Sequence, residues 1–270
     1  MLKLHILGTC SGTEPMPNRH HCSFVVEYND RLYFFDAGET CSYTAYLKGL
    51  DPIKTRKVII SHVHFDHIGG LANLFGVIRK VNGRYHESAP MDVELYIPDI
   101  RVWYGLDLMR FPDLVLENPG MQPTFTTQRT ALGVTVTAHE YEDGLLFEED
   151  GLRVTALHNH HLPHEDGTPW KSFGFLIEAD GKRIVYSGDT GGLDDYAPLM
   201  PADLLLTETG HHHPTDVAQA LIDHDLVPGK LAFIHHGRDI LNHYAEQKAE
   251  LTQLLGDRVV ILEDYATLTL

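Results

Sequence analysis

His62-Val63-His64-Phe65-Asp66-His67 contains four side chains that can bind a metal ion within six residues. Alternate side chains of an extended segment point to the same side, so His62, His64 and Asp66 are expected to converge. Neutral imidazole and carboxylate suit Zn²⁺, Fe or Mn better than Ca²⁺ or Mg²⁺. The alternative is a solvated, His-rich loop, because the chain has 19 His in 270 residues. The density of ligands in this segment favours a transition-metal centre.

The flanking residues indicate how the backbone presents this motif. The apolar run 57–60 before the motif is typical of a strand, and residues 68–75 after it have the spacing of a helix. Gly69 and Gly70 allow a tight turn and a close approach of the backbone without a Cβ clash. The motif is therefore expected in a loop that joins a strand to a helix.

The motif and its two glycines resemble the His-x-His-x-Asp-His signature of the metallo-β-lactamase superfamily. The resemblance implies an α/β (α+β) fold, a four-layer αββα sandwich of two mixed sheets flanked by helices. It also implies three further ligands at strand ends, in the order lone His, bridging Asp and last His. No linker or low-complexity run divides the chain, so residues 1–270 are expected to form one domain of this fold.

Three later segments resemble the parts of the family that carry these ligands. Residues 182–186 have a strand pattern and end in Ser187-Gly188-Asp189-Thr190, so Asp189 is the expected bridge, with an ordinary turn residue as the alternative. The family's spacing from a Val-Thr-Ala strand favours His161 as the lone His, with His160 in reserve. An apolar strand at 230–234 ends in His235-His236, of which His235 is favoured. The resemblance thus implies two ions, one held by His62, His64, His161 and Asp189, the other by Asp66, His67, Asp189 and His235.

Two N-terminal segments narrow the resemblance to the ribonuclease Z-like branch. Residues 7–15 with Arg19 resemble its Leu-Gly-Thr-x-x-Gly-x-Pro opening, with one extra residue before the Pro, and are expected beside the metals. Residues 34–39 resemble its Phe-Asp-x-Gly-Glu segment. Asp36 would then orient a ligand His by accepting its second ring hydrogen. The alternative interpretation is that Asp36 is an ordinary turn residue after the strand at 32–35.

One motif of that branch is altered in this chain. Residues 204–209 stand where the branch has Leu-Leu-x-His-Glu-Ala-Thr, but Thr207 replaces the His and Thr209 the Ala. Glu208 remains a candidate partner of a metal ligand and a candidate catalytic residue. His212 or His213 is expected to compensate for the missing His.

The implied activity is that of a binuclear metal-dependent hydrolase, in which a metal-bridging hydroxide attacks a small phosphodiester or related ester. Two divalent transition-metal ions are expected, Zn²⁺ first, with Mn²⁺ or Fe as alternatives. Asp66 is expected to orient the nucleophile or take its proton. His213, Glu208 and His243 are candidate proton donors to the leaving group.

Other activities of the same fold remain open at this point. A thioesterase or a lactonase would use the same seven ligands. A non-catalytic, metal-binding regulatory protein is the alternative of another class. A flavin-linked di-iron oxidoreductase is disfavoured, because those relatives have Glu where His64 stands.

Charge and composition restrict the partners. With 21 Lys+Arg against 38 Asp+Glu, the net charge is −17, which opposes binding of a large nucleic acid. A small-molecule ester is the expected substrate, and a homodimer is compatible with the sequence. No apolar run approaches the roughly 20 residues of a membrane span. Three Cys without a paired spacing predict a reducing, cytoplasmic location.

A coarse secondary-structure prediction completes the sequence analysis. Strands are expected at 2–7, 23–28 and 31–35, with a hairpin turn at Asn29-Asp30, and helices at 216–223 and 245–255, with Thr215 as an N-cap. Residues 79–150 give the weakest pattern. Substrate specificity is expected there, around Trp103, and at 164–170, with ordinary packing as the alternative.

Overall fold

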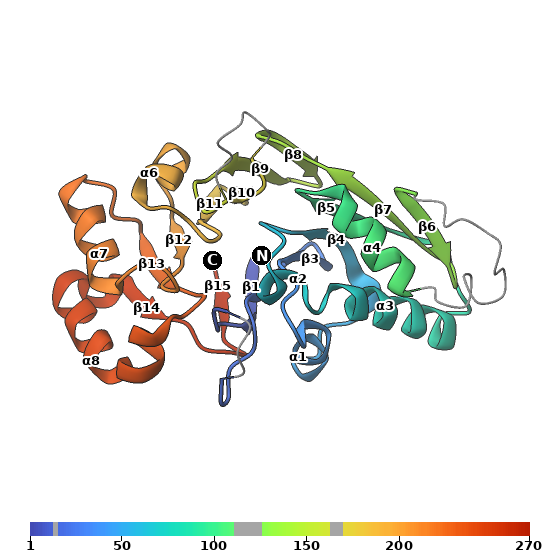
Figure 1. Cartoon of the computed structure of the whole chain (residues 1–270), viewed down its shortest axis with the longest axis horizontal. Helices are drawn as coiled ribbons and strands as arrows, with labels where there is room; N and C mark the ends of the chain where they lie inside the picture. The colour runs from blue at the N-terminus through green and yellow to red at the C-terminus, as the bar shows by residue number, and fades with distance from the viewer. Residues whose placement is uncertain (13–15, 111–125, 163–169) are drawn as a thin grey trace.

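The structure is a computed structural model that describes residues 1–12, 16–110, 126–162 and 170–270 (Figure 1). Glu14 and Pro15 of the N-terminal motif and most of the expected specificity segment 164–170, including His164, lie outside the described residues.

The first sheet has eight strands among the described residues, in the order β15-β1-β2-β3-β4-β5-β7-β6. The pairs β3–β4, β4–β5 and β5–β7 are parallel and the others are antiparallel. The strands are β1 Lys3–Gly8, β2 Ser23–Tyr28, β3 Arg31–Phe35, β4 Thr55–Ile59, β5 Met91–Ile97, β6 Gln128–Ala131, β7 Val134–Glu140 and β15 Thr267–Thr269.

The second sheet has seven strands in the described part of the chain, in the order β14-β13-β12-β11-β10-β9-β8. The pairs β11–β12, β12–β13 and β13–β14 are parallel. The strands are β8 Gly144–Glu149, β9 Leu152–His158, β10 Phe173–Ala179, β11 Lys182–Tyr186, β12 Leu204–Thr207, β13 Lys230–Phe233 and β14 Val259–Ile261. Both sheets are mixed, as expected.

Helices cover the outer face of each sheet (Figure 1). On the first sheet they are α1 Cys41–Leu47, α3 Leu71–Tyr85 and α4 Ile100–Arg110, and on the second α6 Leu193–Tyr196, α7 Pro214–Asp223 and α8 Arg238–Leu255. The short helix α2 Phe65–Ile68 and the 3₁₀ turns Pro52–Lys54, Ala197–Leu199 and Gly256–Arg258 connect these elements.

Three apolar clusters account for the layers. One lies between the two sheets and includes Phe24, Phe35 and Phe175. The other two each join a sheet to its helices. A strand with one apolar face toward each neighbouring layer reads as a nearly continuous apolar run, which explains the pattern of residues 57–60 and 204–206. The expected four-layer αββα sandwich is therefore confirmed.

A partly buried ionic cluster also links the two sheets. Glu149 of β8 in the second sheet accepts contacts from two cations of β4 in the first, Lys57 Nζ at 2.9 Å and Arg56 Nε at 3.0 Å. Arg31 of β3 pairs with the same carboxylate. These charges are only partly exposed, so removing one of them would leave its partners incompletely paired, which costs more than at the surface.

Several local predictions are confirmed and several are wrong. β2 and β3 have the predicted bounds, and Asn29 and Asp30 both have the positive φ of a tight hairpin turn. Thr215 is not an N-cap, because α7 begins at Pro214 with His213 before it. The last long helix begins at Arg238, not at 245, and is interrupted at His243.

The motif itself folds differently from the extended loop expected. His67 N and Ile68 N both bond to His64 O, at 3.0 Å and 3.1 Å, and this closes the first turn of α2. Asp66 therefore lies on a helix and does not follow the alternation that His62 and His64 share. Trp103 is fully buried and packs against Phe75, so the packing alternative holds for this residue. None of the described helices is long and apolar enough to cross a membrane.

Candidate metal centre

The candidate ligands follow the carboxyl ends of strands in both sheets. His62 comes after β4, His161 after β9, Asp189 after β11 and His235 after β13. Parallel neighbouring strands end at the same edge of a sheet, so the loops that follow them are brought together there. The two sheets pack face to face, and this places the edge of one opposite the edge of the other (Figure 1).

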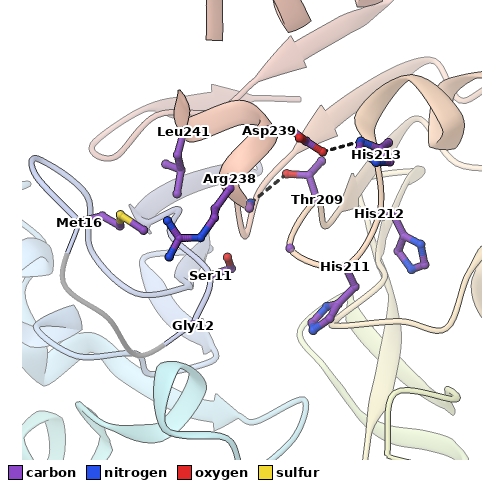
Figure 2. A pocket seen from close by; sticks show the side chains of 12 residues that line it. Ser11, Gly12, Met16, Thr209, His211, His212, His213, Arg238, Asp239 and Leu241 are labelled. Atoms are coloured by element: carbon purple, nitrogen blue, oxygen red, sulfur yellow. Dashed lines mark hydrogen bonds and ion pairs between the residues drawn. The ribbon is translucent and has the colours of Figure 1, made fainter. Parts of the chain in front are cut away.

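A cavity of about 570 Å³ opens beside these loops (Figure 2). The first residues of α8, including Arg238 and Leu241, line it together with Ser11, and His211 faces them from the loop after β12. Its volume is within the range typical of small-molecule sites. Among the described residues that line it, Arg238 is the one guanidinium and Asp239 the one carboxylate, and Asp239 is turned toward His213 at 2.5 Å.

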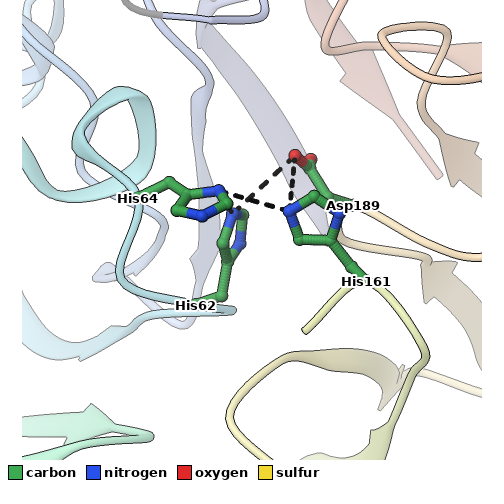
Figure 3. A group of neighbouring side chains, drawn as sticks. All are labelled: His62, His64, His161 and Asp189. Carbon is green, nitrogen blue, oxygen red and sulfur yellow. Dashed lines mark hydrogen bonds and ion pairs between the residues drawn. The ribbon is translucent and has the colours of Figure 1, made fainter. Parts of the chain in front are cut away.

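The first ligand group is formed by His62, His64, His161 and Asp189 (Figure 3). His64 Nδ1 lies 3.0 Å from His62 Nε2 and 3.2 Å from His161 Nε2. Asp189 Oδ2 lies 3.7 Å from both of those Nε2 atoms. A tetrahedral ion bound at 2.0–2.2 Å separates its ligand atoms by about 3.3–3.6 Å, so these four atoms have the spacing of one ligand shell.

The second group uses the other oxygen of Asp189. Asp189 Oδ1 lies 3.3 Å from His67 Nε2 and 3.3 Å from His235 Nδ1. Asp66 Oδ2 lies 3.7 Å from His67 Nε2 and 3.1 Å from His235 Nε2. Asp189 thus faces each group with a different carboxylate oxygen.

Three atoms of the second group show that a metal ion fits it. His67 Nε2, Asp189 Oδ1 and His235 Nδ1 are buried and have no hydrogen-bond partner. Buried polar atoms normally have one, and three that converge without a partner form a donor set that a divalent ion satisfies. The mixture of imidazole and carboxylate suits a transition metal.

Electrostatics differ between the two groups. Burial and the neighbouring imidazoles hold the pKa of His62 well below its usual value, and burial also lowers the pKa of His161. These rings are therefore neutral, the form that binds a metal. Burial lowers the pKa of His235 as well, but the carboxylates of Asp189 and Asp66 outweigh it and raise the pKa to about 9.

Hydrogen bonds outside the two groups hold the ligands in place. His67 Nδ1 lies 2.9 Å from Asp36 Oδ2, the contact expected from the sequence. Gly12 N donates to Asp66 Oδ2 at 2.8 Å, so the N-terminal loop does lie beside the candidate ligands. Burial raises the pKa of Asp66, but the hydrogen bond from His235 and the charges of His67 and His235 outweigh burial and lower the pKa.

Close backbone approaches also require glycine at two positions. A Cβ on Gly70 would overlap Gly38 O, and one on Gly210 would lie 2.8 Å from His235 Nδ1. His235 itself has a φ of 52°, the left-handed region that non-glycine residues seldom adopt. Such strain, of about 1–3 kcal/mol, is typical of functional sites.

The structure distinguishes between the two candidates in each pair of neighbouring histidines, His160 and His161, and His235 and His236. His160 lies outside the ligand groups and pairs through Nδ1 with Asp195. The ring of His236 is fully buried, with Nε2 donating to Leu262 O at 2.7 Å, and burial lowers its pKa to about 3. The geometry therefore places His161 and His235, and not their neighbours, among the candidate ligands.

The region expected to hold a proton donor contains a residue that the sequence analysis missed. His211 Nδ1 lies 2.9 Å and 3.0 Å from the two oxygens of Glu208, and His211 forms a group with Asp189 and His235. Glu208 is fully buried, and its bond with His211 raises the pKa of that ring. The sequence did contain a signal for this residue. Thr207 stands where the branch has a His before Glu208, and His211 follows Glu208 by three residues and could replace that His.

The other candidate donors lie away from both ligand groups. His213 pairs with Asp239 and is two-thirds exposed, and His243 lies 3.8 Å from Glu246 on α8. His212 Nε2 bonds to Thr190 O at 2.8 Å. Geometry thus favours His211 over the three His residues named from the sequence.

Comparisons with known proteins agree with this architecture. A family model described as "Anti-Pycsar protein Apyc1" matches residues 2–199, which include all the candidate ligands except His235. A ribonuclease Z from Methanothermobacter thermautotrophicus is 30% identical over 156 residues, which are 58% of this chain and 43% of that relative. The alignment thus spans less than half of the relative's length.

Solved structures show the fold. The metallo-β-lactamase fold protein YhfI from Bacillus subtilis has a TM-score of 0.70 at 18% identity, covering 99% of this chain and 98% of that one. The short form of human tRNase Z has a TM-score of 0.69 at 20% identity, with coverage of 99% and 98%. The resemblance to metallo-β-lactamase fold proteins of the ribonuclease Z kind is therefore confirmed.

Proposed function

The chain belongs to the anti-Pycsar protein Apyc1 family, and on this basis we propose that it is a binuclear metal-dependent phosphodiesterase acting on a small substrate. The observation that carries the proposal is the placement of Asp189, whose two carboxylate oxygens face two separate ligand groups. A carboxylate shared in this way is the arrangement of a two-metal hydrolytic site.

The seven residues proposed as ligands are His62, His64, Asp66, His67, His161, Asp189 and His235. Zn²⁺ is the ion we propose first, with Mn²⁺ and Fe as alternatives, because the donors are imidazole and carboxylate. Two such ions, when bound, polarise the phosphoryl oxygens and supply a strong nucleophile at neutral pH. Orientation of the nucleophile and transfer of protons are the roles that we propose for side chains of the protein.

Asp66 and His211 are the residues we propose for proton transfer. Asp66 Oδ2 lies among the ligands of the second group and is positioned to orient the nucleophile or take its proton. Glu208 holds His211 at Nδ1, so Nε2 is the ring nitrogen left to donate a proton to the leaving group. A donor matters because an alkoxide leaves slowly without a proton.

Size and charge favour a small phosphodiester over a nucleic acid. The net charge of −17 disfavours a long polyanion, whereas the cavity beside the ligand groups is large enough for a small molecule. Cyclic nucleotides are small phosphodiesters with one negative charge, and family membership makes them the first substrates to test.

The test uses protein loaded with Zn²⁺ or Mn²⁺ and four substrate classes: cyclic nucleotides, a p-nitrophenyl phosphodiester, a thioester and a lactone. We expect hydrolysis of both phosphodiesters and loss of that activity in Asp189→Ala. Turnover of the thioester or lactone alone would establish the alternative activity of the fold. Protein that binds two ions per chain and hydrolyses none of the four would indicate the regulatory alternative.

A further inference from the structure

We propose that Tyr186 is a positioning residue for the metal centre, which fixes the ring of His67 through the carboxylate of Asp36. The proposal rests on the metal-binding function proposed above and adds a residue to it that the ligand pattern does not reveal. Tyr186 is the last residue of β11 in the second sheet, whereas Asp36 and His67 follow strands of the first.

Three side chains form a continuous chain of hydrogen bonds. The hydroxyl of Tyr186 donates to Asp36 Oδ2 at 2.7 Å, and the same oxygen lies 2.9 Å from His67 Nδ1. The opposite nitrogen of His67, Nε2, is one of the three buried atoms without a hydrogen-bond partner. The position of Asp36 Oδ2 therefore sets the direction in which His67 presents its free nitrogen.

Tyr186 differs from the other partners of this carboxylate. Ser61 donates to Asp36 through its backbone N at 2.7 Å and through its hydroxyl at 2.9 Å, but Ser61 belongs to the same loop as the His62 ligand. Only the Tyr186 bond, among the hydrogen bonds to Asp36 in the described residues, comes from the opposite sheet. It therefore ties Asp36 to a part of the fold outside the motif.

The hydroxyl matters for this role and the ring does not. The ring packs edge-on against Phe24, with centroids 5.1 Å apart, a contact that a phenylalanine would keep. Burial and the nearby Asp36 carboxylate raise the pKa of Tyr186 well above its usual value, so the hydroxyl keeps its proton. A buried hydroxyl without a partner costs free energy; here Asp36 accepts its hydrogen bond, and Cys22 Sγ lies 3.6 Å from the same oxygen.

The position of Tyr186 also links two ligands. Asp189 follows it by three residues, so the end of β11 supplies both the proposed bridging carboxylate and the bond to Asp36. Both ring nitrogens of His67 thus face groups connected to the end of β11: Nδ1 through Asp36, and Nε2 at 3.3 Å from Asp189 Oδ1. Loss of the hydroxyl is expected to loosen the second ligand group more than the first.

The test compares Tyr186→Phe with a matched control, Tyr28→Phe. Tyr28 also donates its hydroxyl across the two sheets to an aspartate, Asp180 Oδ1, at 2.8 Å, but at residues that are not candidate ligands. Zn²⁺ affinity is measured by competition with a chromogenic chelator, and metal content by elemental analysis. The absorption spectrum of the Co²⁺-loaded protein reports the geometry of the ligand shell.

We expect Tyr186→Phe to weaken binding of one of the two ions by about 10-fold or more, the usual effect of losing such an outer partner. Its Co²⁺ spectrum should change, whereas Tyr28→Phe should alter neither quantity. Tyr28→Phe should also lower thermal stability less, because its partner Asp180 is half-exposed and Asp36 is fully buried. Equal metal affinities and spectra in the two variants would overturn the proposal. Wild-type protein that binds no metal would instead overturn the proposed function.

A second measurement separates positioning from a general effect on folding. If Tyr186 acts through Asp36, then Tyr186→Phe should weaken metal binding little further in protein that already carries Asp36→Asn. Additive losses of affinity in the double variant would show that Tyr186 does not act through Asp36, and would overturn the proposed role.

Discussion

His211 Nδ1 lies 2.9 Å from Glu208 Oε1 and 3.0 Å from Glu208 Oε2, so a buried carboxylate holds a half-exposed imidazole beside the candidate metal ligands. Glu208 follows β12 directly, and its Oε1 also accepts a bond from Thr190 N at 3.0 Å, one residue after Asp189. The pair is thereby anchored to the strand ends that carry the ligands.

Replacing His211 should affect catalysis in a way that depends on the leaving group. For a phosphodiester with an alkoxide leaving group, His211→Asn is expected to lower kcat by about 100-fold or more, with a small change in KM, because protonation of that group is lost. For a p-nitrophenolate leaving group the loss should be much smaller. His213→Asn is the control and should keep both activities. Equal losses on the two substrates would argue against a proton-donor role.

Replacing Asp189 should remove metal ions from both ligand groups, because its two oxygens face different groups. Asp189→Asn is expected to lower the metal content per chain by more than one ion after dialysis, measured by elemental analysis. Asp225→Asn, at an exposed turn, is the control and should retain the wild-type content. Loss of a single ion in Asp189→Asn would contradict the bridging assignment.

The two neighbouring histidines after β13 should behave differently on replacement. His235→Ala is expected to lose the ion of the second group with little change in folding. His236→Ala removes the nearer of two side-chain donors to Leu262 O, while Arg19 Nη1 remains at 3.3 Å, and it leaves a cavity where the buried ring lay. The variant should destabilise the protein by roughly 1–3 kcal/mol while both ions remain bound. Metal content and thermal denaturation, measured on both variants, distinguish them. The reverse pattern would assign His236 as the ligand.

Glu149 should make stability depend on pH. Burial raises the pKa of this carboxyl, but Lys57 and Arg56 outweigh it and hold the pKa below its usual 4.5. A depressed pKa in the folded state stabilises the fold above pH 4.5, and this contribution is lost as the pH falls through the folded-state value. Glu149→Gln should therefore lower Tm at pH 7, corresponding to roughly 1–3 kcal/mol.

The difference in Tm between Glu149→Gln and the wild type should narrow as the pH falls below 4.5. Denaturation scans at pH 7 and near pH 4 provide the measurement. Glu148→Gln, at a neighbouring exposed position of β8, is the control and should show little difference at either pH. If the difference in Tm between Glu149→Gln and the wild type stayed constant with pH, the charge of Glu149 would contribute nothing to stability.

Local patterns predicted much of the fold. The strand pattern of residues 23–28 and 31–35, with Asn29-Asp30 between them, defined β2 and β3 because a tight turn and an apolar strand depend on neighbouring residues. The pattern was least informative at 79–150, where the structure has β8 and the long helix α4. Trp103 there is a core residue, and an aromatic side chain alone does not distinguish core from site.

The sequence by itself, through its resemblance to a family with ligands at strand ends, indicated which strand ends carry the candidate metal ligands, because each candidate lies close to a recognisable strand pattern. Only the tertiary structure decided which side chains meet. Asp66 does not follow the expected alternation, because hydrogen bonds from His67 N and Ile68 N to His64 O place it in the helix α2. His211 meets Asp189, and Tyr186 meets Asp36, because two sheets pack face to face and bring together residues far apart in the chain. Such contacts depend on how strand ends converge, which local spacing does not encode.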